Sequence, residues 1–226
     1  VVQAFPIIPD VIVEPPSYDF GGVRRGQTAT ANIVVRHDGV GNLTVSTTTL
    51  LGSHAADFSI SSGGGPFVLA SGASRTMVVS FAPSAAGPRI ATLRLMTSDP
   101  DEPVVDVPLA GTGTEPDVAA SPASLDWGDV RVTTTAERTL EVRNEGTADL
   151  RVTATSGEGP AAAEFTIAAG GGAFTLAPGA VRTVRLVFAP TGGTRTAVLR
   201  VASDDPDEAV LGVPLSGRGV DPEIAV

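Results

Sequence analysis

The side chains best suited to binding an ion gather in two short acidic stretches, each built around an Asp-Pro-Asp sequence. Their acidic residues are Asp99, Asp101 and Glu102 in the first stretch and Asp204, Asp205, Asp207 and Glu208 in the second. Carboxylate oxygens at this density suit Ca²⁺, although the spacing is not that of an EF-hand loop. The alternative is turn chemistry, in which Pro fixes φ and Asp bonds its own backbone. We favour the turn, expect no resident cofactor, and keep a weak Ca²⁺ site as the alternative.

The sequence contains few residues that could carry out catalysis. The chain has no Cys, which excludes disulfides, thiol catalysis and Cys-ligated metals. Its two histidines, His37 and His54, could belong to a Ser-His-Asp triad only on paper, because no Gly-x-Ser-x-Gly elbow accompanies them. We expect both to be ordinary surface residues and the chain not to be an enzyme.

The chain repeats itself. Phe20-Gly21-Gly22-Val23 matches Trp127-Gly128-Asp129-Val130 at an offset of 107 residues, and His37 and His54 match Asn144 and Ala161. One residue is lost near Gly87, after which Val107-Pro108-Leu109 matches Val213-Pro214-Leu215 at an offset of 106. A leading segment, residues 1–8, is therefore followed by two copies of one domain, about residues 9–113 and 114–219.

Residues 220–226 begin the pattern again. We expect them to start a third repeat or to form a free strand, with an edge available to a partner at Glu223, Ile224, Ala225 and Val226.

Each copy reads as a series of short, β-rich segments bounded by Gly, Pro, Asn and Asp. In the first copy, eight segments are expected at about 10–14, 18–20, 27–36, 43–48, 57–61, 74–82, 89–97 and 104–110. The pattern predicts an all-β chain: two tandem immunoglobulin-like β-sandwiches of seven to eight strands each, in an extended arrangement. Pro108 and Pro214 would place the last strand at an edge or a bulge.

The aromatic residues also follow the repeat, in the pairs Phe20/Trp127, Phe58/Phe165, Phe67/Phe174 and Phe81/Phe188. Matched rings are expected of a shared core, which leaves few exposed rings for stacking on sugars or bases.

The formal net charge is −10, and every basic side chain is Arg. This charge disfavours nucleic acid and anionic lipid as partners. No apolar run approaches the roughly 18 residues that cross a bilayer, so we expect no membrane insertion.

The order of motifs resembles the abnormal-spindle/hydin (ASH) type of immunoglobulin-like domain, which is related to major-sperm-protein and PapD-like sandwiches. The motifs run Phe/Trp-Gly-x-Val, Asn-x-Gly, Phe-x-Ile, Val-x-Phe-x-Pro, Ser-Asp-Pro-Asp and Pro-Leu-x-Gly-x-Gly, and His37 departs from the Asn that Asn144 supplies. The resemblance implies the sandwich fold and a binding or scaffolding role without enzymatic activity. Bacterial versions often occur as tandem repeats in exported surface proteins.

We therefore expect a non-enzymatic structural or adhesive module of a longer bacterial repeat protein. It would act as a spacer and protein-binding scaffold at the cell surface or in the extracellular space. A protein partner or a second copy would associate through strand edges. Two alternatives stay open: a cytoplasmic cytoskeletal or ciliary scaffold, and an accessory spacer domain of a secreted enzyme.

Overall fold

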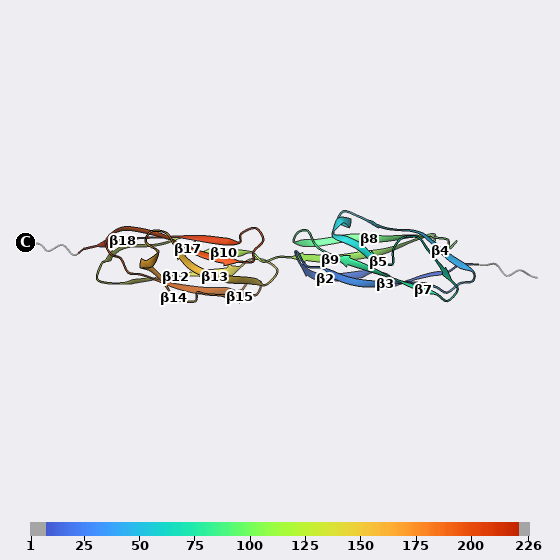
Figure 1. Ribbon diagram of the computed structural model, residues 1–226, viewed down its shortest axis with the longest axis horizontal. Helices are drawn as coiled ribbons and strands as arrows, with labels where there is room; N and C mark the ends of the chain where they lie inside the picture. Colours follow the sequence, from blue (N-terminus) through green and yellow to red (C-terminus); the bar gives the residue numbers. More distant parts are fainter. Residues whose placement is uncertain (1–7, 222–226) are drawn as a thin grey trace, which may run out of the picture. The chain divides into compact units, whose positions relative to one another are not determined.

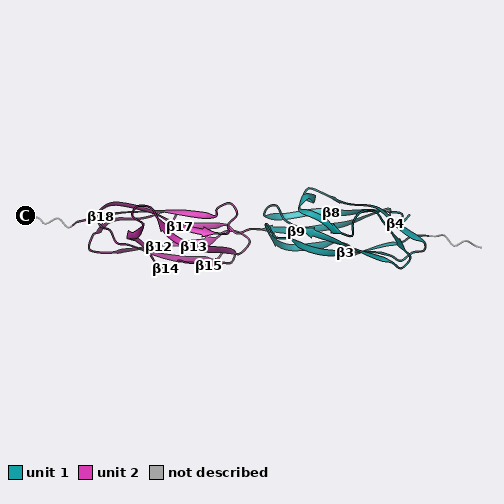
Figure 2. Cartoon of the chain, in the orientation of Figure 1, with its two compact units in different colours: residues 1–114 teal, residues 115–226 magenta. Residues whose placement is uncertain are grey.

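A computed structural model describes residues 8–221 of the chain. The chain divides into two compact units, residues 1–114 and 115–226 (Figure 2). In the described residues both units are built from β-strands with one short 3₁₀ turn each (Figure 1). Among those same residues, no helix is long and apolar enough to span a membrane. The expected all-β class is confirmed.

The described part of each unit contains nine strands. In the first unit they are β1 (Val11–Glu14), β2 (Tyr18–Arg24), β3 (Ala29–His37), β4 (Asn42–Leu51), β5 (Phe58–Ser62), β6 (Phe67–Ala70), β7 (Ser74–Phe81), β8 (Gly87–Thr97) and β9 (Val104–Thr114). In the second they are β10 (Val118–Ser121), β11 (Leu125–Arg131), β12 (Ala136–Asn144), β13 (Leu150–Glu158), β14 (Phe165–Ala169), β15 (Phe174–Leu176), β16 (Val181–Phe188), β17 (Gly193–Ser203) and β18 (Val210–Val220). The strand that the sequence pattern did not separate is β6, with its counterpart β15.

The strands of each unit form two sheets that enclose one core. In the first unit the orders are β1-β3-β7-β5 and β2-β9-β8-β4-β6, and the second unit repeats both as β10-β12-β16-β14 and β11-β18-β17-β13-β15. The chain changes sheet between β1 and β2, at Pro15 and Pro16, where proline removes ladder donors. The last strand, β9, pairs antiparallel with β8 and parallel with β2.

Matched aromatic rings fill the two cores, as the repeat predicts. The rings of Phe58 and Phe81 stack with centroids 4.7 Å apart, and those of Phe165 and Phe188 stack at 4.4 Å. Trp127 takes the place of Phe20 beside the second pair, and its Nε1 donates a hydrogen bond to the carbonyl of Ala136 at 2.9 Å. The second core thus holds an indole together with the partner that a buried N–H requires.

The strand that contains Pro108 is not at the edge of its sheet, so the expected edge position is wrong. The proline itself, however, lies just before the part of β9 that pairs with β2. In the sheet, β9 lies between β2 and β8, so it is not an edge strand. Pairing with β2 begins only at Leu109, so the proline precedes the residues that need donors on that side. Gly111, which is three residues after Pro108, faces the aromatic core. A Cβ at this position would lie too close to Cε1 of Phe81.

Candidate functional site

The first acidic stretch forms the loop between β8 and β9, and its buried member is Asp99. One carboxylate oxygen, Oδ2, accepts the backbone N–H of Val11 at 2.8 Å. The other, Oδ1, accepts the N–H groups of Asp101 at 2.9 Å and Glu102 at 3.3 Å. Asp99 thereby fixes the loop's own turn and ties it to β1, which belongs to the opposite sheet.

The second unit repeats this arrangement at Asp205. Its Oδ2 accepts the N–H of Val118 at 2.8 Å, and its Oδ1 accepts those of Asp207 and Glu208 at 3.1 and 3.2 Å. Burial alone would raise the pKa of Asp205, but the hydrogen bonds, led by that from Val118, hold this pKa below its ordinary value. The Asp205 carboxylate therefore acts as an ionised clip between the two sheets of its sandwich.

The neighbouring acids sit in a different environment. Asp207 is exposed, and its hydrogen bond to Asp205 and the negative charge of Asp205 raise its pKa. Asp117 has a raised pKa because of partial burial and the charges of Asp205, Glu145 and Glu115. The Asp204 carboxylate accepts the N–H of Arg151 at 2.8 Å.

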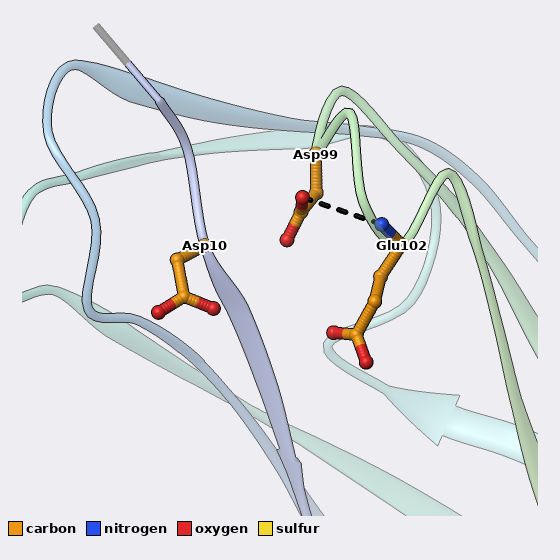
Figure 3. Close-up of side chains that lie close together, drawn as sticks. All are labelled: Asp10, Asp99 and Glu102. Carbon is orange, nitrogen blue, oxygen red and sulfur yellow. Dashed lines mark hydrogen bonds between the residues drawn. The ribbon is translucent and has the colours of Figure 1, made fainter. Parts of the chain in front are cut away.

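One triplet of carboxylates in the described residues is close enough to share a cation. Asp10, Asp99 and Glu102 each offer an oxygen within 4.8 Å of the others, and Figure 3 shows the three side chains around one gap. Asp99 already uses both oxygens on backbone N–H groups, as a turn-forming Asp does. Asp101 is exposed and contributes its N–H to the turn. The Asp-Pro-Asp motif therefore forms a turn that Asp99 closes. The carboxylates of Asp10 and Glu102 lie beside it and are exposed.

His37 differs from expectation: it is fully buried instead of exposed. Its Nδ1 lies 3.2 Å from the N–H of Gly39 and 3.0 Å from the carbonyl of Asp10, and its Nε2 lies 3.2 Å from the carbonyl of Gly41. These contacts hold the turn between β3 and β4 against the segment that enters β1.

Asn144, which is also fully buried, occupies the same place in the second unit. Its Oδ1 accepts the N–H of Gly146 at 3.0 Å, and its Nδ2 donates to the carbonyls of Ala148 and Leu176 at 2.8 and 2.9 Å. The signal was present in the sequence, since a His that alternates with Asn marks a position needing both an acceptor and a donor.

His54 lies in the short 3₁₀ region before β5 and is partly exposed. Its Nδ1 contacts Oγ of Ser53 at 3.1 Å and the N–H of Ile90 at 3.3 Å. His37 and His54 lie at different turns of the first unit. The Glu223–Val226 strand expected at the end of the chain lies outside the described residues.

The clearest candidate binding feature is a pair of uncharged strand edges, β5 and β14. Each pairs on one side only, with β7 and β16 respectively. Neither contains a charged residue or a proline. Register shifts do not set these edges apart, since β5 and β14 each carry one, as β2 and β11 do. The remaining edge strands have only three or four residues, and β2 and β11 carry charged residues, which oppose strand addition.

The comparisons with known proteins point to one family. The family model described as "Abnormal spindle-like microcephaly-assoc'd, ASPM-SPD-2-Hydin" (ASH) matches residues 9–104 and 116–209. No match was found among curated proteins.

Two solved structures illustrate what the chain is similar to. A protein of unknown function from Porphyromonas gingivalis W83 shares 17% identity over 92% of this chain and 99% of its own, with a TM-score of 0.39. The ASH/PapD-like domain 7 of human CEP192 shares 20% identity over 48% of this chain and 89% of its own, with a TM-score of 0.38. The family assignment rests on the sequence match.

Proposed function

The chain belongs to the ASH family, and from this membership and its open strand edges we propose that it is a non-enzymatic, protein-binding scaffold. Each unit closes a core of its own, so a unit can act as a spacer without help from its neighbour. We further propose that the chain works at the cell surface or in the extracellular space, as part of a longer bacterial repeat protein. Ca²⁺ has no required role in this proposal.

The observation that carries the proposal is the uncharged edge of β5 and of β14. An edge strand has backbone N–H and C=O groups that can pair with an added strand, so main-chain hydrogen bonds supply affinity and alternate side chains supply selectivity. The hydroxyl-bearing residues Ser59 and Thr166 lie at matching positions in these strands and are exposed. A partner with an extended, weakly charged segment fits both edges.

The test has two arms. Antibody detection in fractionated cells of the source organism is expected to place the protein in the surface or extracellular fraction. Retention in the cytoplasm would instead favour the cytoskeletal alternative. For binding, proteins captured by the purified chain are identified and their affinities measured against a variant carrying Ser59→Lys and Thr166→Lys.

Lysine on an edge strand opposes strand addition while its side chain stays in solvent. We expect the double variant to keep the wild-type melting temperature and to bind at least about 10-fold more weakly. A partner held equally well by both proteins would rule out edge pairing. Turnover of a substrate by the purified chain would overturn the non-enzymatic role.

A further inference from the structure

The outward side of one sheet in the first unit carries an unusual set of exposed apolar residues. This sheet is β2-β9-β8-β4-β6, and the set, which we call the apolar face, consists of Leu51, Val68, Ile90, Met96 and Val104. Ile90 and Val68 are each 57% exposed. Scattered surface hydrophobics are ordinary, but several on one sheet indicate a contact surface.

The strand registers place these side chains on the same outward surface, in groups at opposite ends of β8 and β9. On β8, Ala91, Leu93 and Leu95 are in the core, so Ile90 and Met96 point outward by alternation. Met96 lies directly opposite Val104 on β9. At the other end of the same strands, a shallow depression of about 360 Å³ is lined by residues that include Ile90, Thr92, Pro108 and Ala110.

Leu51 joins this end of the face from the neighbouring strand. On β4 it lies directly opposite Thr92, so its side chain extends the same outward surface. Val68 lies on β6, at the edge of the sheet beyond β4.

The second unit shows that the fold does not require these residues. It has Glu158 where the first unit has Leu51, Thr175 for Val68, Thr196 for Ile90 and Ala202 for Met96. Only Val104 keeps its type, as Val210. The second unit exposes Val198 and Val210 on its own equivalent sheet, but the first unit carries the larger apolar set, which this fold does not require.

The charges at the centre of the apolar face cancel. Nε and Nη2 of Arg94 donate to the two carboxylate oxygens of Asp106 at 2.7 and 2.6 Å. A paired guanidinium and carboxylate can enter an interface without leaving an unpaired charge. This matters in a chain with a net charge of −10, because two copies repel each other least where the surface is neutral.

We propose that the apolar face packs against the same face of a second copy of the chain, giving a two-fold symmetric dimer. Two sheets can pack face to face at a separation of about 10 Å. Five strands about 4.8 Å apart, with β8 and β9 eleven residues long, present on the order of 700 Å² of sheet. Standard interfaces range down to about 600 Å² per partner, so one sheet can supply the required area. This inference goes beyond the proposed scaffold role and does not use the β5 edge.

Sedimentation equilibrium from about 1 to 200 µM tests the proposal. The wild-type chain is expected to show a monomer–dimer equilibrium with a Kd in the micromolar range. Added salt should strengthen the dimer, because it screens the repulsion between two acidic chains.

The variant combines Leu51→Glu, Ile90→Thr and Met96→Ala, which are the residues that the second unit carries at these positions. It is expected to weaken the dimer by about 100-fold and to run as a monomer. The matched control is Val198→Thr. It places in the second unit the residue that the first unit carries at the equivalent position, Thr92, and it should leave the dimer unchanged. Circular dichroism and a melting curve establish that each variant folds. If the triple variant does not fold, Ile90→Thr alone should weaken the dimer about 10-fold.

A wild-type chain that stays monomeric over the whole concentration range overturns the proposal. So does a dimer that the folded variants leave intact, or one that Val198→Thr disrupts as strongly. Loss of partner binding through Ser59→Lys and Thr166→Lys, with the dimer unchanged, separates this inference from the edge-pairing role.

Discussion

Replacing Asp205 by Ala removes a carboxylate that is 3% exposed and accepts three backbone N–H groups. The N–H groups of Asp207 and Glu208 belong to exposed residues and can turn to water, whereas Val118 is buried. An orphaned buried donor costs about 1–3 kcal/mol. Loss of the buried charge itself offsets part of this cost, because Asp205 no longer has to be desolvated. We expect the second unit to lose about 2 kcal/mol of unfolding free energy.

The chain contains one Trp, and it reports on this unit alone. Trp127 is 5% exposed and packs on Phe165 and Phe188 in the second core. Tryptophan fluorescence during a urea titration therefore follows the second unit. A loss of about 2 kcal/mol lowers the midpoint by roughly 1 to 2 M urea.

Two controls sharpen the measurement. Asp207→Ala removes an exposed acid from the same loop and should change stability by less than about 0.5 kcal/mol. Asp99→Ala makes the equivalent change in the first unit, which has no Trp, and should leave the fluorescence transition in place. If Asp205→Ala shifts the midpoint no more than Asp207→Ala does, the carboxylate does not clip the two sheets.

The pH dependence has a defined sign. Because the folded pKa of Asp205 is lower than its ordinary 3.8, its contribution is complete above that value. The contribution is lost as the pH falls from there through the lowered folded pKa. The difference between wild type and Asp205→Ala should therefore shrink in acid.

Three further predictions are measured by urea titration or calorimetry. Gly217→Ala should destabilise the second unit by about 1–3 kcal/mol, because a Cβ there would lie 2.5 Å from Cε1 of Phe188. At Gly212 the nearest atom is 3.4 Å away, so Gly212→Ala should be tolerated. The urea midpoints of the two variants test this difference. Asp117→Asn should raise the neutral-pH stability by a few tenths of a kcal/mol, because burial and neighbouring acids raise the pKa of Asp117. That gain should vanish as the pH falls through the raised pKa, and midpoints at neutral and acidic pH measure it. Calcium at about 1 mM should leave the calorimetric melting temperature unchanged, since the oxygens of Asp99 already accept backbone N–H groups; a clear rise would restore the Ca²⁺ site.

Most of the fold could be predicted from the internal repeat in the sequence. Matched rings such as Phe58 and Phe165 predict two separate cores because a duplicated residue retained in type indicates a duplicated environment, and the stacking distances bear this out. The sequence pattern did not separate strand β6, Phe67–Ala70, which directly follows a Gly-Gly-Gly-Pro stretch that disfavours a strand.

Positions that depend on contacts between distant strands could not be predicted. The alternation of His37 with Asn144 marks a polar position, but nothing local in the sequence says that His37 contacts the carbonyl of Asp10 or that Asp99 accepts the N–H of Val11, 88 residues away. The apolar face could not be predicted from the sequence for the same reason, since it depends on how the strands pair. Leu51 and Ile90 look like core residues in the sequence until the bulge in β4 and the alternation of β8 turn them outward.

The parallel pairing of β2 with β9 bears on how a unit would resist being stretched. The two strands run in the same direction over Tyr18–Arg24 and Leu109–Thr114. A pull toward the two ends of the chain therefore slides one strand past the other and loads several hydrogen bonds together, instead of opening them one by one. The rate of forced unfolding follows the unfolding barrier, so we expect high rupture forces in single-molecule stretching. Easy peeling of β9 at low force would contradict this expectation.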